Sequence, residues 1–454
     1  MKKLYRFSAI ALLVLPLIFT SCSDYLDRDD DDNITEADVF ARYEKVNGLV
    51  SDVYAAAKKA DRPLVFFEHF SNSAITDECE GTNVEGNITN NFNNGAWNPN
   101  SLPGSVGQYW EALYEGIRKA NLIIENVQKY NTPDNPQQDG DLRNRIGEMY
   151  FMRGYFHMLL LRMYGEAPYI DRVINAGDNM DFKKESVHSM VEKIVTDAQT
   201  AYGMVPNKYV KTSENFGRVD KGACLGLISF VRWVAATPLW NGASQYGYNL
   251  RRVFENEYAY DATRWRKAKE AAKAVLDFEV GGTKRYSLYT KHDANDFKDP
   301  ADGNLNDSRV YARLWDMFYD MDAFANEYVF FMTKSKDQAW QGDIYPPSRE
   351  GSSRQQPVQE QVDEYEYIVG DYGYPVYSAE ARKGGYDDTN PYVKGTRDPR
   401  FYRDVIYHGA PYRNNKNESK TINTASGSDK IGATNATTVS YTHLRAHETK
   451  ANLV

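Results

Sequence analysis

The chain has 454 residues, a formal net charge of −9 and an aromatic content of 13%. An acidic chain repels phosphate backbones, and this one has no basic patch interleaved with aromatic residues, so nucleic acid is excluded as a partner. Only three cysteines and seven histidines are present, so we predict no structural disulfide, no metal site and no cofactor.

The N-terminus has the three parts of a secretory signal peptide. Basic residues within MKKLYR are followed by an uncharged run at 7–19 and by the small pair Thr20-Ser21. The uncharged run is too short to cross a bilayer, so we assign residues 1–21 to a signal peptide.

Cys22 follows this small pair directly, and the ending FTSC resembles the lipobox of bacterial lipoproteins, with Phe19 where leucine is usual. We therefore predict that Cys22 is lipidated and anchors the mature chain to a membrane, because several acyl chains hold a protein more firmly than one. The acidic stretch at 22–34 then serves as a solvated tether. The alternative is a plain signal peptide followed by a chance cysteine.

Helical periodicity dominates the segment from Thr35 to residue 278. Thr35-Glu36-Ala37-Asp38 fits a capping box, and apolar residues recur on one helical face up to about Lys59. Later segments repeat apolar residues at three- and four-residue steps, with small alanines between large anchors, and would pack as antiparallel pairs. These predicted helices cover residues 108–127, 141–164, 186–203, 219–236 and 263–278.

The rest of the chain lacks long periodic segments. Residues 71–107 are rich in Asn and Gly, and residues 281–430 combine loops with short strand-like runs such as YVFFM at 328–332. Long loops in a compact domain are often functional. We predict a mainly α fold of tetratricopeptide-like helix pairs, in one body at 35–438, with long loops and a more irregular C-terminal half that contains short strands.

The last residues, 439–454, resemble the translation of a sequencing adapter rather than a protein segment. His443 and His447 have the i, i+4 spacing of a metal-ligand pair on a helix, but we discard the pair on this ground. We therefore expect that the natural chain is cut near Thr438 and that its own C-terminal segment is missing.

Several separated segments, in the same order, resemble the SusD/RagB family of outer-membrane nutrient-binding lipoproteins. An aromatic-rich helix with an Ala-Asn pair lies at 109–127, and an Arg-led helix runs into Tyr-Gly and Pro at 153–170. The later matches are NEYVFFM at 326–332, PVQEQVDEYEYIVG at 357–370 and NPYVKGTRDPRFYRDVIYHG at 390–409. The further helices with which the family normally ends have no counterpart before Val439.

The resemblance implies a helical protein, anchored by lipid to the outer membrane and exposed on the surface of a glycan-foraging Gram-negative bacterium. Such a protein binds an oligosaccharide or polysaccharide and delivers it to a SusC-like TonB-dependent transporter, without catalysis. Among the matched residues, Asn121 and Arg153 are interpreted as packing or capping residues. Arg397, Asp398 and Arg400 are interpreted as a salt-bridged turn before a strand.

Sugar binding needs an aromatic face for the CH groups of the sugar ring, and amide or charged side chains for its hydroxyls. In the loop at 71–107 these ingredients are Trp97, Asn98 and Asp77, at a position that carries ligand contacts in some members of the family. Trp315 and Tyr319, one helical turn apart in LWDMFYDMD, form a second candidate set. The tryptophans can instead belong to the core, as we expect for Trp240.

Two other functions compete with glycan capture. A peptide-binding uptake lipoprotein of the same fold is the first. A glycoside hydrolase is the second, and it needs two carboxylates that flank a glycosidic bond, yet nothing singles out a pair among the 63 acidic residues. Nucleophile-elbow, zinc-protease and phosphate-loop motifs are absent from the sequence, so we name no catalytic residue.

Overall fold

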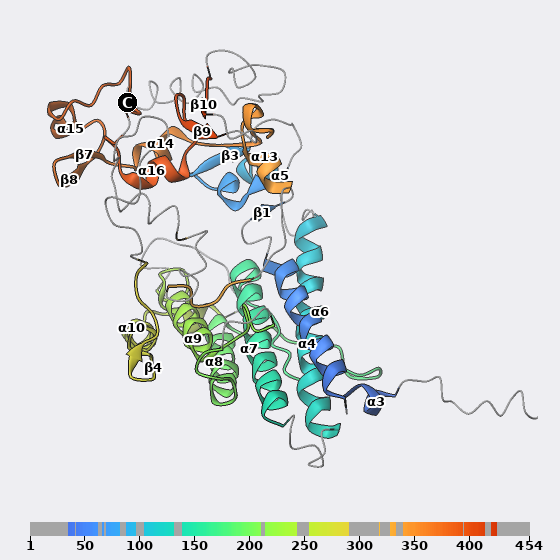
Figure 1. Cartoon of the computed structure of the whole chain (residues 1–454). Coiled ribbons are helices and arrows are strands. Elements are labelled where there is room, and N and C mark those ends of the chain that lie inside the picture. Colours follow the sequence, from blue (N-terminus) through green and yellow to red (C-terminus); the bar gives the residue numbers. More distant parts are fainter. Residues whose placement is uncertain are drawn as a thin grey trace, which may run out of the picture.

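The computed structural model comprises a helical body and a second region of loops, short helices and short strands, here called the loop lobe (Figure 1). The structure describes residues 35–40, 42–61, 66–67, 70–81, 88–96, 104–130, 139–209, 214–242, 254–289, 317, 327–332, 339–393, 395–413 and 419–424.

The helical body consists of long helices that pack against one another in chain order (Figure 1). This order gives the predicted stack of helix pairs, because neighbours in sequence are also neighbours in space. Its members are α4 (Tyr43–Asp61), α6 (Gly104–Tyr130), α7 (Asp139–Tyr164), α8 (Val187–Met204), α9 (Lys221–Ala236) and α10 (Ala262–Asp277). The predicted helices are confirmed, with ends that differ by a few residues.

Side-chain caps explain where three of these helices begin. Ser186 precedes α8, Asp220 precedes α9 and Asp261 precedes α10, and each accepts a hydrogen bond from a backbone N–H in the first turn. Such caps satisfy N–H groups that have no partner inside the helix.

The predicted first helix is divided into two elements, the short α3 (Glu36–Phe40) and α4. The predicted capping box at its start is confirmed. The hydroxyl oxygen of Thr35 accepts a hydrogen bond from the Asp38 N–H at 3.2 Å, and the Asp38 carboxylate accepts one from the Thr35 N–H at 3.0 Å.

The core of the helical body lies around α7, which contacts α4, α6, α8 and α9. Residues 151–161 of α7 are all buried, so this helix shows no polar stripe. Gly116 of α6 lies against Phe156 of α7 so closely that a Cβ atom at Gly116 would lie 2.5 Å from the Phe156 ring. The missing side chain therefore lets the two helices approach.

The loop lobe is built from two stretches that are far apart in the sequence. The first contains β1 (Phe66–Phe67), β2 (Phe70–Ser71), η3 (Asn72–Ile75), β3 (Cys79–Gly81) and α5 (Ile88–Asn93). The second contains α13 (Ala339–Ile344), η6 (Pro347–Arg349), β6 (Gln355–Pro357), α14 (Gln359–Asp363), β7 (Tyr367–Val369), β8 (Tyr372–Tyr374), α15 (Ala379–Lys383), α16 (Pro399–Asp404), β9 (Pro411–Arg413) and β10 (Ser419–Thr421).

The strands of the described residues form antiparallel two-stranded sheets. Most pair locally, as predicted: β7 with β8, β9 with β10, and β4 (Glu279–Val280) with β5 (Thr283–Lys284). The exception is β3, whose residues 79–81 pair with residues 355–357 of β6. This long-range ladder joins the two stretches of the loop lobe.

Three local predictions were wrong. The run YVFFM at 328–332 is not a strand, because Phe330 points into the helical body instead and contacts the rings of Phe151 and Tyr155. Residues 71–107 are not one long loop, since they hold η3, β3, α5 and the start of α6. The segment after Arg397 begins a helix, α16, rather than a strand.

Candidate functional site

Of the sequence-predicted binding residues, Asp77 lies in the described part of the chain. It occupies an exposed turn between η3 and β3. Trp97, Asn98, Trp315 and Tyr319 lie outside the described residues, as does Cys22. The roles of these residues therefore remain predictions from the sequence.

The surroundings of Asp77 show how the loop lobe is held together there. The Asn93 side chain donates a hydrogen bond to the Ala74 carbonyl at 3.1 Å, which ties the end of α5 to η3. The chain then turns at Gly95, whose φ of 63° favours glycine, and reaches Ala96. The described segment before Trp97 thus packs on the same elements that carry Asp77.

The family-like residues Asn121 and Arg153 are structural, as predicted. Asn121 is fully buried and donates hydrogen bonds to the carbonyls of Ile170 (3.2 Å) and Arg172 (2.9 Å). Its side-chain oxygen accepts a hydrogen bond from Arg153 at 2.9 Å. Both side chains have their partners inside the helical body, so neither is available to a ligand.

Arg397 departs from the predicted salt bridge. Its guanidinium is buried, donates to the carbonyls of Tyr365 (2.8 Å) and Val362 (2.6 Å), and lies 5.1 Å from the centre of the Phe401 ring. Asp398 pairs with Arg400 at 2.5 Å and caps α16. This group fixes the backbone of the C-terminal part of the loop lobe.

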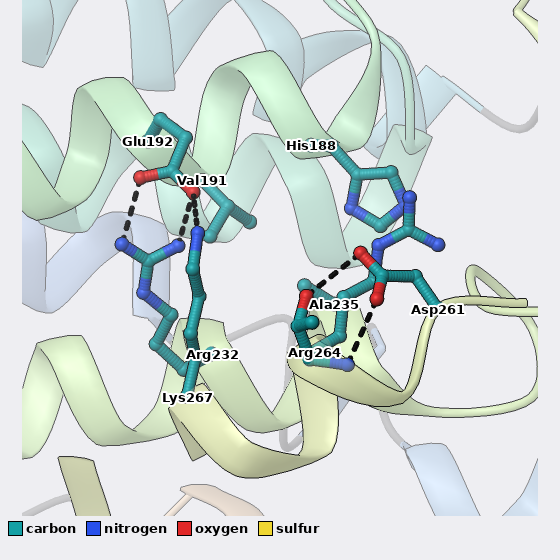
Figure 2. A pocket seen from close by; sticks show the side chains of 9 residues that line it. His188, Val191, Glu192, Arg232, Ala235, Asp261, Arg264 and Lys267 are labelled. Carbon is teal, nitrogen blue, oxygen red and sulfur yellow. Dashed lines mark hydrogen bonds and ion pairs between the residues drawn. The ribbon is translucent and has the colours of Figure 1, made fainter. Parts of the chain in front are cut away.

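A polar cleft of about 200 Å³ lies between α8, α9 and the first turns of α10 (Figure 2). The Glu192 carboxylate accepts two hydrogen bonds from Arg232, at 2.5 and 2.7 Å, and one from Lys267 at 3.0 Å. On the other side, the Asp261 carboxylate is bound by Thr263.

The charges of this cleft compensate one another. The hydrogen bonds from Arg232 lower the pKa of Glu192 to about 2, so this carboxylate stays ionised. Burial, assisted by the nearby Arg264, lowers the pKa of His188 to about 4, and the neutral ring donates from Nε2 to the Trp240 carbonyl at 2.9 Å. The polar contacts of the cleft therefore connect three helices, and they do not leave a preformed anion site.

An apolar groove of about 620 Å³ lies between α7, α9, α10 and residues 327–332. Phe330 occupies part of it, with its ring centre 4.9 Å from that of Phe151, while Trp233 and Leu276 are 51% and 69% exposed. The lining offers almost no directional hydrogen-bonding groups, so it does not suit the hydroxyls of a sugar.

Tyrosines gather in the second stretch of the loop lobe, at 365–407. The ring of Tyr386 packs edge-on against those of Tyr367 (5.5 Å) and Tyr377 (5.9 Å). A neighbouring group stacks Tyr392 on Phe401 at 5.4 Å. The sequence analysis did not select this cluster, although the density of tyrosines in YEYIVGDYGYPVY was a usable signal.

Metal-ligating clusters and membrane-spanning helices are both absent from the described residues. No three His, Cys, Asp or Glu side chains among them gather in a way that would hold a metal ion. Within the same residues, no helix is both long and apolar enough to cross a membrane. Cys79 and Cys224 are both free thiols.

Comparison with known proteins assigns the fold. Residues 24–231 match the model of a SusD-like family described as starch-binding and associating with the outer membrane. A curated SusD-like protein, P2 from Formosa agariphila, is 24% identical over 202 residues, which is 44% of this chain. Over this part of its length the chain is similar to SusD-like proteins.

Solved structures of SusD-like proteins share the fold of this chain. A SusD-like protein from Bacteroides fragilis aligns over 86% of the chain with a TM-score of 0.59 and 18% identity. A SusD-like carbohydrate-binding protein from the same organism aligns over 82% with a TM-score of 0.56 and 14% identity. At these identities the likeness concerns the fold alone.

The chain covers only part of the length of these relatives. It spans 38% of the length of the Formosa protein, and 66% and 61% of the two Bacteroides chains. The mainly helical fold with few short strands is therefore established for the part present here, and the activity of a whole SusD-like protein is a matter for proposal.

Proposed function

We propose that this protein captures oligosaccharides at the outer membrane and delivers them to a SusC-like TonB-dependent transporter. The match of residues 24–231 to a starch-binding, outer-membrane-associated family carries the proposal. The signal peptide at 1–21, the lipidated Cys22 and the tether at 22–34 would place residues 35–438 outside the cell. In this proposal, residues 439–454 have no role.

The sugar contacts are assigned to the loop lobe and to the segment around Trp315. Trp97 and Trp315 would stack on sugar faces, while Asn98, Asp77 and Tyr319 would bind hydroxyls. Exposed Asp77 is compatible with this role, because a hydroxyl can approach it directly. The helical body contributes rigidity, since its buried polar groups are already paired with one another.

Binding measured on a panel of neutral polysaccharides and peptide mixtures tests the proposal. We expect the full chain to bind at least one polysaccharide, and Trp97→Ala and Trp315→Ala to weaken that binding about tenfold. Trp265→Ala is the matched control, because Trp265 is 43% exposed on α10 in the helical body.

Each competing function has its own readout in the same experiment. Binding to peptides but to no polysaccharide would replace glycan capture by peptide capture. Release of reducing ends from a bound polysaccharide would show a hydrolase instead. For the partner, we expect the protein to co-purify with a SusC-like TonB-dependent transporter of the same cell, and its failure to do so would contradict the delivery step.

A further inference from the structure

Tyr377 in the loop lobe combines exposure with a fixed orientation. Its side chain is 53% exposed, yet its ring stands at 90° to that of Tyr386, with centroids 5.9 Å apart. Tyr386 is buried and packs in turn against the buried Tyr367. An exposed ring whose orientation is already fixed by a buried neighbour loses little conformational entropy when a ligand stacks on it.

The edge of the Tyr377 ring is polar. Burial and the nearby Asp363 carboxylate, at the end of α14, raise the pKa of the Tyr377 hydroxyl. The same carboxylate accepts a hydrogen bond of 2.6 Å from the Gln359 side-chain amide. A phenol, a carboxylate and an amide therefore lie near one another beside the exposed ring face.

A second pair of polar groups flanks the supporting ring. Arg382 of α15 pairs with Asp388 at 3.1 Å, and both side chains are about half exposed. Asp388 also acts electrostatically on the hydroxyl of Tyr386, which places the pair near the ring cluster. Half-exposed donors and acceptors of this kind can exchange water for ligand hydroxyls at small cost.

The chemistry of this surface favours one kind of ligand. Asp363 and the exposed Asp387 and Glu380 oppose an anionic ligand such as a phosphate or a nucleic acid, while the charge of Asp388 is paired with that of Arg382. Binding of an apolar protein helix would remove water from these charged groups without replacing its hydrogen bonds, which is costly. A neutral sugar meets both conditions, because its CH face fits the ring and its hydroxyls fit the polar edge.

We propose that Tyr377, with Asp363 and Gln359 at its edge and Tyr386 beneath it, is a stacking site for one residue of a neutral oligosaccharide. This site rests on the proposed function of glycan capture. It uses other residues than the predicted contacts at Trp97 and Trp315.

The test uses the full chain and a neutral polysaccharide that the unmodified protein binds. We expect Tyr377→Ala to weaken binding about tenfold, and Tyr377→Phe to lose much less because it keeps the ring. Tyr260→Ala is the control, since Tyr260 is 48% exposed but lies beside α10 in the helical body. Thermal unfolding of each variant checks that it is folded.

If Tyr377→Ala does not fold, Tyr377→Leu replaces it, because leucine keeps apolar volume against Tyr386 but offers no ring face. Should the folded variant bind as tightly as the unmodified protein while Trp97→Ala binds less, the Tyr377 site is overturned and glycan capture stands. Should the unmodified protein bind no neutral polysaccharide, the proposed function fails, and the Tyr377 site fails with it.

Discussion

Arg153 of α7 and Asp197 of α8 are joined by two hydrogen bonds, one of 2.8 Å from Nε to Oδ2 and one of 2.5 Å from Nη2 to Oδ1. Both side chains are buried, and Tyr169 donates a third hydrogen bond of 2.6 Å to the same carboxylate. The pair therefore connects two helices at the centre of the helical body, in water-poor surroundings where an unpaired charge is costly.

Asp197→Ala is expected to lower the free energy of unfolding by about 3–5 kcal/mol, because it leaves the Arg153 guanidinium buried without its carboxylate. Urea unfolding followed by circular dichroism measures the change. The control is Lys183→Ala, since Lys183 and Asp181 form an exposed pair that contributes about 0–1 kcal/mol. Equal effects of the two substitutions would contradict the structural role of the buried pair.

Stability is expected to fall as the pH is lowered below about 6.5, because of His157. Burial lowers the pKa of this side chain to about 3, and its ring stacks on Tyr169 at 3.8 Å. Its Nε2 accepts a hydrogen bond from the Ile170 N–H, so the neutral ring carries its proton on Nδ1 and donates to the Arg153 carbonyl.

The direction follows from proton uptake. Between pH 6.5 and 3 the unfolded chain protonates His157 and the folded chain does not, so the stabilisation present above pH 6.5 decreases as the pH falls. Between pH 6.5 and 5 the loss from this group is about 2 kcal/mol. Urea unfolding at pH 7.5 and 5 measures it, and His157→Gln should show a smaller difference between the two pH values. An unchanged difference would rule out His157 as its source.

Gly116→Ala is expected to destabilise the helical body by about 1–3 kcal/mol, because the added methyl would overlap the Phe156 ring and force α6 and α7 apart. Gly48→Ala in α4 is the matched substitution. Nothing lies within 4 Å of the added methyl there, so we expect a gain of about 0.5–1 kcal/mol from helix propensity. Differential scanning calorimetry compares the two variants, and the same sign of change for both would contradict the close packing at Gly116.

Cys22→Ala is expected to release the protein from the membrane fraction, because Cys22 is the proposed site of lipidation. Metabolic labelling with a fatty acid and fractionation of the cell envelope measure this change. Cys79→Ala serves as the control for loss of a cysteine, since Cys79 is a free thiol within the loop lobe. Fatty-acid labelling that persists in Cys22→Ala would exclude Cys22 as the anchor.

The helical body could be predicted from the sequence because its helices carry local signals. Ser186, Asp220 and Asp261 are recognisable caps, and apolar residues recur at helical spacing between them. Even α7, whose residues 151–161 are all buried, was placed correctly, because the largely apolar run is too long for a strand.

The loop lobe could not be predicted in the same way. The pairing of β3 with β6 depends on two three-residue strands that are distant in the sequence, and neither shows an alternating pattern. The exposure of Tyr377 and the burial of Arg397 depend on tertiary packing, which local sequence does not encode. The roles of Trp97, Asn98, Trp315 and Tyr319 stay predictions.

The ladder between residues 79–81 and 355–357 also sets an order of assembly. The long helices of the helical body contact their neighbours in the chain, so they can fold as each one becomes available from the N-terminal side. The segment that carries Asp77 must wait for β6, which is made much later, before its edge is paired. Until then that edge is open to other strands, so slow or interrupted synthesis would expose the chain to misfolding at this strand first.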